Sequence, residues 1–209
     1  MRRQSKRVYY GDMKREKINT VTTRLIIINT AVFLLGILSM VSPLFAGLPL
    51  GSETGGVYYP AVMAGQWWRI ITAMFLHANI AHLASNMLAL FALGSTAERM
   101  LGHWRYALTY FLAGIAGNLL TLLWDGFTGR YYFTVGASGA ILGILGAILA
   151  VSVNKKDGIP GMNVKRVILA CILMLIPSSG NISMSAHIGG FVGGFVSMYA
   201  IGTIFPKSR

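Results

Sequence analysis

"TVGASGAILGILGA", residues 134–147, places Ser138 beside a glycine at the head of a long apolar run. Small residues at such intervals allow membrane helices to pack closely, so the stretch indicates a helix inside a bundle. Serine fits such packing, but it can also act as a nucleophile when a base lies beside it. The other polar residues of the chain distinguish these two interpretations.

The composition indicates a membrane protein. Of the 209 residues, 55% are hydrophobic and 11% are charged, whereas soluble domains carry about 25% charged residues. The 18 Lys and Arg residues outnumber the 6 Asp and Glu residues, but they fall in short runs between apolar segments. This distribution is typical of topology signals, so we expect no nucleic-acid partner. The single cysteine, Cys171, cannot form an intramolecular disulfide.

Six apolar windows bounded by charges or turn residues are candidate transmembrane helices. A bilayer core of about 30 Å requires about 20 helical residues per crossing. The windows cover residues 23–40, 80–97, 104–124, 138–153, 165–176 and 184–205. We therefore predict an all-α membrane protein, with a six-helix domain over residues 23–205 between a basic tail at 1–22 and a short tail at 206–209.

The charge distribution predicts an orientation. All Lys and Arg residues except Arg69 and Arg130 lie on one side of the predicted bundle. Because basic residues favour the cytoplasmic side, we predict that both termini lie in the cytoplasm. As a separate expectation, the membrane is a bacterial plasma membrane. The amino-terminal tail is too long and too polar for the start of a signal peptide, so we expect it to be retained, either solvated or lying on anionic lipid.

The segment between the first two windows is then external. Residues 41–79 are rich in Gly, Pro and aromatic residues. We expect a folded loop at the membrane interface, with Trp67 and Trp68 as anchors in the belt of aromatic residues.

Polar residues inside the windows are the candidates for function, because polar side chains are costly in hydrocarbon. All six acidic residues fall in loops or at window ends, which argues against a carboxylate relay, an aspartyl dyad and an HExxH zinc site. The remaining polar candidates are His82 and Asn86 in the second window, Ser138 in the fourth and His187 in the sixth, with His77 just before the second.

Four of these groups fall at similar depths. With a rise of 1.5 Å per residue, Asn86, Ser138, His82 and His187 lie about 18, 22, 24 and 27 Å above the cytoplasmic boundary. His82 and Asn86 are four residues apart and share one helix face. The layer lies in the outer half of the bilayer, where water could reach it through a cavity.

The residue types in this layer suit acyl transfer. His187 could take the proton of Ser138, making the serine a nucleophile. The backbone N–H groups at the start of the fourth helix, with Asn86 and His82, could stabilise the oxyanion that such an attack forms. Gly136 and Gly139 would allow the backbone to approach a substrate closely.

Other interpretations remain open from the residues alone. "GASGAILG" and "GGFVGG" (residues 189–194) are typical of close helix packing, and a membrane histidine can be a purely structural hydrogen bonder. Three histidines could bind a metal, although no carboxylate or cysteine lies among them. A client-binding protein and a small transporter are the other function classes. We expect His103, in the basic loop, to be solvated.

Five motifs resemble the rhomboid family of intramembrane serine proteases. "HANIAHLASN" is similar to the second-helix pattern of two histidines and an asparagine, "GASG" to the nucleophile motif and "AHIGGFVGG" to the sixth helix. "WWR", with Trp68 and Arg69, resembles the motif of the external loop, and "ERMLGHWRY" the cytoplasmic turn after the second helix. The motifs occur in the family's order over about residues 20–205.

The resemblance implies a rhomboid-like six-helix bundle whose short fourth helix begins at the base of a water-filled cavity. It implies Ser138 as nucleophile, His187 as general base and acid, and an oxyanion hole of His82, Asn86 and the Ser138 backbone N–H, with His77 in support. Substrates would be single-pass membrane proteins cut near the external end of their transmembrane segment. No cofactor is expected, and the oligomeric state is left open.

The sequence departs from the family at one position. Members often carry Tyr or Phe one turn after the nucleophile, where this chain has Leu142. Leucine can fill the volume but cannot stack on the catalytic histidine, so the resemblance implies a looser orientation of His187.

Overall fold

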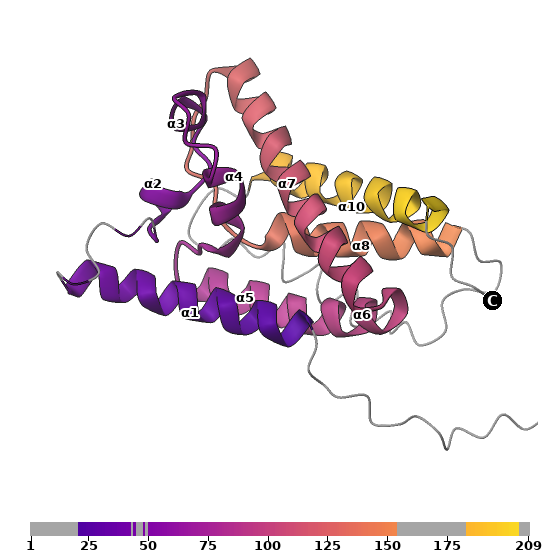
Figure 1. Cartoon of the computed structure of the whole chain (residues 1–209). Helices are drawn as coiled ribbons and strands as arrows, with labels where there is room; N and C mark the ends of the chain where they lie inside the picture. Colours follow the sequence, from indigo (N-terminus) through magenta and orange to yellow (C-terminus); the bar gives the residue numbers. More distant parts are fainter. Residues whose placement is uncertain (1–20, 43, 45–47, 49, 154–182, 205–209) are drawn as a thin grey trace, which may run out of the picture.

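The computed structural model describes residues 21–42, 44, 48, 50–153 and 183–204. The predicted fifth window at 165–176, with Cys171, lies outside this part of the chain. The longer helices and their bounds are α1 (Val21–Val41), α5 (Ile80–Ala89), α6 (Ser95–Leu101), α7 (His103–Thr128), α8 (Ser138–Val153) and α10 (Met184–Ile204). A π-helical stretch, η4 (Leu90–Gly94), joins α5 and α6 into one continuous helix (Figure 1).

The described part is helical, and no strand occurs in it beyond the single bridge between Val57 and Thr134. Four of its helices are long and apolar enough to cross a membrane: Val21–Val41, Ile80–Leu101, His103–Thr128 and Met184–Ile201. A shorter apolar helix covers Ser138–Val151. The predicted class, an all-α multi-pass membrane protein, is therefore confirmed, while the count of six helices stays a prediction.

Two windows were predicted too short. The second helix continues to Leu101 and the third to Thr128. Each extension contains an acidic residue: Glu98 lies in α6, and Asp125 lies in the last turn of α7. Both side chains are buried in the last turn of their spans, so these two carboxylates lie at the ends of spans, as predicted.

Small residues bring α7, α8 and α10 together. A Cβ at Gly190 or Gly194 of α10 would collide with the backbone carbonyls of Gly139 or Gly143 of α8. The contacts advance together along both helices, so α8 and α10 run parallel (Figure 1). On the other side of α10, Gly193 meets Ala116 of α7. The predicted packing role of "GGFVGG" is confirmed, because glycines allow these backbones to touch.

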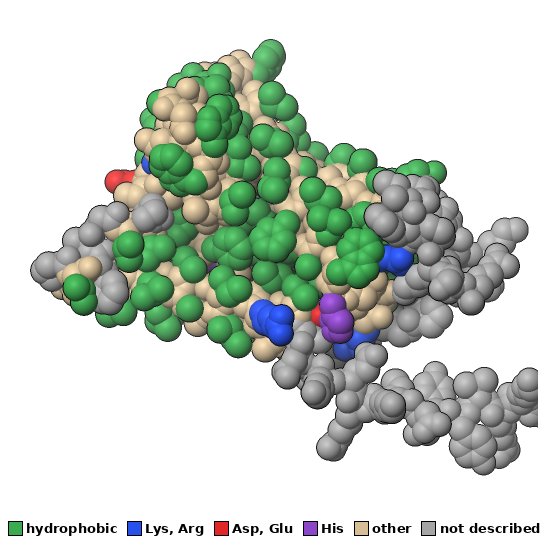
Figure 2. All heavy atoms as spheres, in the orientation of Figure 1, with side chains coloured by type: hydrophobic (Ala, Val, Ile, Leu, Met, Phe, Trp, Pro, Cys, Tyr) green, Lys and Arg blue, Asp and Glu red, His purple; other side chains and the backbone are tan. Residues whose placement is uncertain are grey.

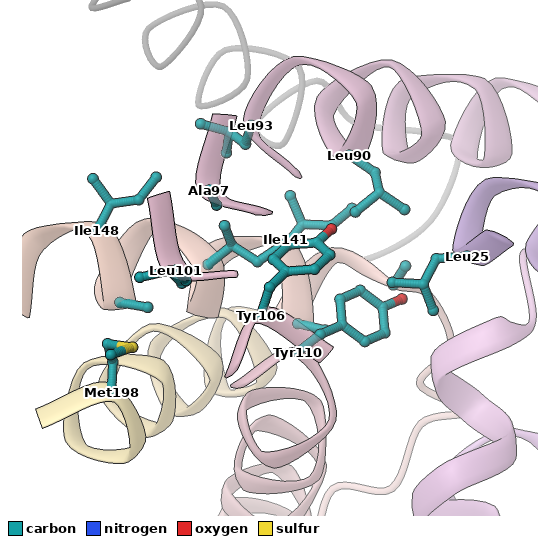
Figure 3. Close-up of a cluster of buried hydrophobic side chains, with 14 of the residues drawn as sticks. Leu25, Leu90, Leu93, Ala97, Leu101, Tyr106, Tyr110, Ile141, Ile148 and Met198 are labelled. Atoms are coloured by element: carbon teal, nitrogen blue, oxygen red, sulfur yellow. The ribbon is translucent and has the colours of Figure 1, made fainter. Parts of the chain in front are cut away.

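A second layer of packing joins α1 and the α5–α6 helix to this centre. Leu25 of α1, Leu90 of η4, Tyr106 and Tyr110 of α7 and Ile141 of α8 are buried in one cluster (Figure 3). Outside the cluster, hydrophobic side chains cover much of the visible face (Figure 2). Exposed examples include Phe91, Leu123 and Val196, as expected for a surface that meets lipid.

The segment between α1 and α5 is folded where the structure describes it. It contains α2 (Ser52–Gly55), α3 (Tyr59–Met63), α4 (Arg69–Thr72) and the 3-10 turn η3 (Ala73–Phe75). Arg69 is buried in it and donates from Nη1 to the carbonyl oxygens of Glu53 (3.0 Å) and Gly56 (2.8 Å). Trp67 and Trp68 are exposed, and their contact with the membrane interface stays a prediction.

Glu98 ties the start of α1 to the turn between α6 and α7. Its carboxylate accepts hydrogen bonds from the backbone N–H groups of Val21 (2.8 Å) and Thr22 (3.0 Å) and from the Thr22 hydroxyl (2.7 Å). His103 Nδ1 lies 2.6 Å from Glu98 Oε1, although 63% of the His103 side chain is exposed. His103 is therefore largely exposed, as expected, and its Nδ1 also contacts Glu98, which was not expected.

Candidate active site

Ser138 and His187 lie in hydrogen-bond contact, with 2.9 Å between Ser138 Oγ and His187 Nε2. Ser138 is the first residue of α8, and His187 lies in the first turn of α10. Because these two helices begin at the same level and touch through Gly139 and Gly190, their first turns present both side chains at one place. A neutral imidazole with its proton on Nδ1 would accept the hydroxyl proton of the serine.

His82 joins this pair through Gly136. Gly136 has a φ of +126°, a backbone conformation that glycine adopts without a steric penalty. A Cβ there would lie 2.8 Å from Cε1 and Nε2 of His82 and 3.8 Å from Ser138 Oγ. The His82 ring therefore lies against the backbone just before the serine.

The position of His82 follows from the start of α5. Asn79 caps this helix, and its side-chain oxygen accepts a hydrogen bond from the His82 backbone N–H at 2.8 Å. Such a cap fixes the first turn of the helix. His82 is therefore held on a defined helix start.

Asn86 is fully buried one turn further along α5. Its Nδ2 donates to the His82 carbonyl oxygen at 2.9 Å. An amide nitrogen has two hydrogens, so one remains for another acceptor. Its Oδ1 has no hydrogen-bond partner among the described residues, and Asn86 lines the cavity that contains Ser138.

His77 packs against the His82 ring and precedes the spanning helix Ile80–Leu101. The two rings meet edge to face, with 5.2 Å between their centroids. Burial, and to a smaller extent the neighbouring His82, lowers the pKa of His77 to about 3. His77 is therefore neutral near pH 7 and can support the His82 ring without adding charge to the site.

Gly139 lies where α8 contacts α10. A Cβ on Gly139 would lie 3.0 Å from the Ala186 carbonyl oxygen of α10. Its lack of a side chain therefore serves the contact between α8 and α10. Close approach of a substrate to Gly139, which also lines the cavity, stays a prediction.

A cavity of about 850 Å³ contains the whole constellation. Ser138, His187, His82 and Asn86 line it. Most of the remaining wall comes from α7, the start of α10 and the segment 130–136. The described residues contain no group of three or more His, Cys, Asp or Glu side chains that could hold a metal ion.

The sequence analysis missed a group of polar residues on the α7 side of the cavity. The hydroxyls of Thr121, Ser183 and Ser185 lie 3.1 to 3.2 Å from one another. Asp125, one turn after Thr121, lines the same cavity. The spacing of Thr121 and Asp125 on one helix face was a usable signal, but the predicted end of the third window at residue 124 removed Asp125 from the helix.

The family model described as Rhomboid domain matches residues 64–204. Rhomboid protease GluP of Bacillus subtilis (strain 168) is 39% identical over 153 residues, which are 70% of this chain and 28% of that protein. RHOMBOID-like protein 5 of Arabidopsis thaliana is 32% identical over 151 residues, 71% of this chain and 48% of that protein.

A third relative is covered more completely. Rhomboid protease AarA of Providencia stuartii is 29% identical over 201 residues, which are 85% of this chain and 71% of that protein. The chain thus spans less than a third of GluP and about half of the Arabidopsis protein, while it spans most of AarA.

Proposed function

Because the chain belongs to the rhomboid family, we propose that it is an intramembrane serine protease in which Ser138 is the nucleophile and His187 the general base and acid. The observation that carries this proposal is the 2.9 Å contact between Ser138 Oγ and His187 Nε2 inside a cavity. The names of GluP and AarA as rhomboid proteases support the same activity.

The dyad would act in two steps. His187 takes the Ser138 proton as Oγ attacks the scissile carbonyl carbon, and the protonated imidazole then gives that proton to the leaving amine, so that an acyl-enzyme remains. A water molecule, deprotonated by His187, hydrolyses the acyl-enzyme and restores both residues. The proton passes between Ser138, His187 and the leaving group; an acidic third member, as in a Ser-His-Asp triad, would orient the imidazole and would not take this proton.

His82, Asn86 and the Ser138 backbone N–H would stabilise the oxyanion of each tetrahedral intermediate. Asn86 has an amide hydrogen beyond the one that it gives to the His82 carbonyl. Such a donor is already in position before charge develops, and losing one costs about 10²–10³ in rate. His77, packed edge to face on His82, would support the ring in this position.

The proposed substrates are single-pass membrane proteins, cut near the external end of their transmembrane segment. Support comes from the position of Ser138 at the first residue of α8, facing a cavity at one end of the bundle. The positive-inside distribution of Lys and Arg supports a topology with both termini in the cytoplasm. That orientation would open the cavity to the external side of a bacterial plasma membrane.

Active-site labelling tests the proposal. Detergent-solubilised protein is treated with a fluorophosphonate, which modifies activated serines, and the labelled residue is identified by mass spectrometry. We expect label on Ser138, none on Ser138→Ala, and full labelling of the control Ser183→Ala, which removes another serine from the same cavity. Equal labelling of the wild type and Ser138→Ala would overturn the proposal.

A further inference from the structure

Asp125 is a buried carboxylate on the cavity wall that the proposed reaction does not use. Asp125 is 5% exposed, and its Oδ2 has no hydrogen-bond partner among the described residues. An ionised carboxylate accepts hydrogen bonds through both oxygens, and burying one without a partner is costly. Asp125 Oδ2 can therefore accept a hydrogen bond from a further donor.

The surroundings of Asp125 increase its preference for a cation. Asp125 lies in the last turn of α7, which contains no basic residue. The carboxyl end of a helix carries partial negative charge, so an acidic residue there adds to a field that is already negative. A positively charged group would be stabilised by both the carboxylate and the helix end.

Asp125 lines the same cavity as the proposed catalytic groups. Thr121, one turn earlier on α7, hydrogen-bonds the hydroxyls of Ser183 and Ser185 at 3.2 and 3.1 Å. Ser185 precedes His187 by two residues in α10. Asp125 therefore lies one helical turn after Thr121, whose hydroxyl contacts two serines that precede His187, toward the loop end of α7.

Arg130 is an internal candidate to pair with Asp125, since it is the one Lys or Arg among the described residues that line the cavity. The Arg130 side chain is exposed. Among the described residues, Arg130 and Asp125 do not form an ion pair. The carboxylate is thus left available to a group that enters the cavity.

We propose that Asp125 is a specificity-determining residue that binds a Lys or Arg side chain of the substrate, a few residues from the scissile bond on the water-exposed side. This inference rests on the proposed proteolysis at Ser138. The charged group of the substrate would donate a hydrogen bond to Asp125 Oδ2. This bond would take the place of the hydrogen bonds to water that the group loses on entering the cavity. A charge-assisted bond of this kind is stronger than a neutral one, so it would discriminate among substrates that fit equally well.

Matched substrates test the inference. One cleaved transmembrane sequence is altered at each water-exposed position near the scissile bond in turn, to Lys, Gln or Glu, and kcat/KM is measured in liposomes. At one position we expect the wild type to prefer Lys over Gln about tenfold. Asp125→Asn should bring that ratio close to one, and Asp125→Lys should favour Glu instead.

Two controls separate the possible outcomes. Glu53→Gln removes a carboxylate from exposed α2, outside the cavity lining, and should leave the Lys preference unchanged. If Asp125→Asn and Arg130→Gln instead slow all three substrates alike, Asp125 serves an internal contact and the inference is overturned. A Lys preference that is absent from the wild type, or unchanged in Asp125→Asn, overturns it as well.

Cleavage of the Gln substrate distinguishes a failure of the specificity role from a failure of the proposed proteolysis. Normal cleavage of the Gln substrate with no effect of Asp125 would reject only the specificity role. No cleavage of any substrate, with no fluorophosphonate label on Ser138, would reject the proteolysis and the specificity role together.

Discussion

The His82 ring lies directly against Gly136, where a Cβ would be 2.8 Å from ring atoms Cε1 and Nε2. Because Gly136 also has a φ of +126°, the backbone before Ser138 and the ring of a proposed oxyanion donor are fixed by the same glycine. The contact links the conformation of one short segment to the geometry of the whole site.

Gly136→Ala should impair catalysis through this contact. A residue other than glycine adopts this backbone conformation at a cost of about 1–3 kcal/mol. The added Cβ would also displace the His82 ring, and a displacement of about 1 Å can lower the rate about 10²-fold. The measurement is kcat on a reconstituted transmembrane substrate. Gly129→Ala is the matched control, because Gly129 also has a positive φ (65°) but nothing lies within 4 Å of its Cβ position; an equal loss in both variants would contradict the role of Gly136.

Asn86→Ala should lower kcat more than it raises KM. The amide is proposed to donate to charge that exists only in the transition state, so its loss should cost about 10²–10³ in kcat. Ser85→Ala, at a neighbouring residue that also lines the cavity, is the control and should change kcat little. A change confined to KM in Asn86→Ala would show that the residue binds substrate instead.

Glu98→Gln should destabilise the protein without altering the chemistry. The substitution turns a buried acceptor of four hydrogen bonds into a neutral group, and bonds to a charged group contribute about 1.5–3 kcal/mol each. We expect a lower Tm in detergent, with normal fluorophosphonate labelling of the folded fraction. His103→Ala should lower Tm less, since it removes one of the four contacts and leaves the bonds of Glu98 to Val21 and Thr22 in place. An unchanged Tm in Glu98→Gln would refute a stabilising link between Glu98 and α1.

His77 should make the stability of the protein depend on pH. Its pKa falls from 6.5 in the unfolded chain to about 3 in the folded protein, so the unfolded state binds the extra proton between these values. The contribution of neutral His77 is complete above pH 6.5 and is lost as the pH falls toward 3. Tm should therefore drop from pH 7 to pH 4.5, and the drop should be smaller in His77→Asn, which keeps a polar group; identical slopes in the two proteins would argue against this linkage.

Much of the fold could be predicted from periodicity and composition. Helix α8 begins and ends where the fourth window does, at residues 138 and 153, because a loop glycine precedes it and polar residues follow it. The small residues of α8 and α10 indicated close packing for the same physical reason that the structure shows. The ends of α6 and α7 were missed because charged residues were taken as boundaries, whereas Glu98 and Asp125 are buried within helices.

The candidate site was predictable in its residues but less so in its surroundings. A shared depth for Ser138 and His187 follows from helix geometry alone, and the structure places them 2.9 Å apart. The cluster of Thr121, Ser183 and Ser185 depends on how α7 meets α10, which no local pattern specifies. Leu142 is half-buried against the core, and its effect on the orientation of His187 stays a prediction.

The most direct test of the central proposal is the cleavage of a single-pass transmembrane substrate by purified protein in liposomes, followed by mass spectrometry of the products. We expect the wild type to cut near one end of the transmembrane segment, while Ser138→Ala and His187→Ala leave the substrate intact and the control Ser183→Ala cuts at the same bond. Cleavage at that bond by Ser138→Ala at the rate of the wild type would contradict the assignment of Ser138 as the nucleophile.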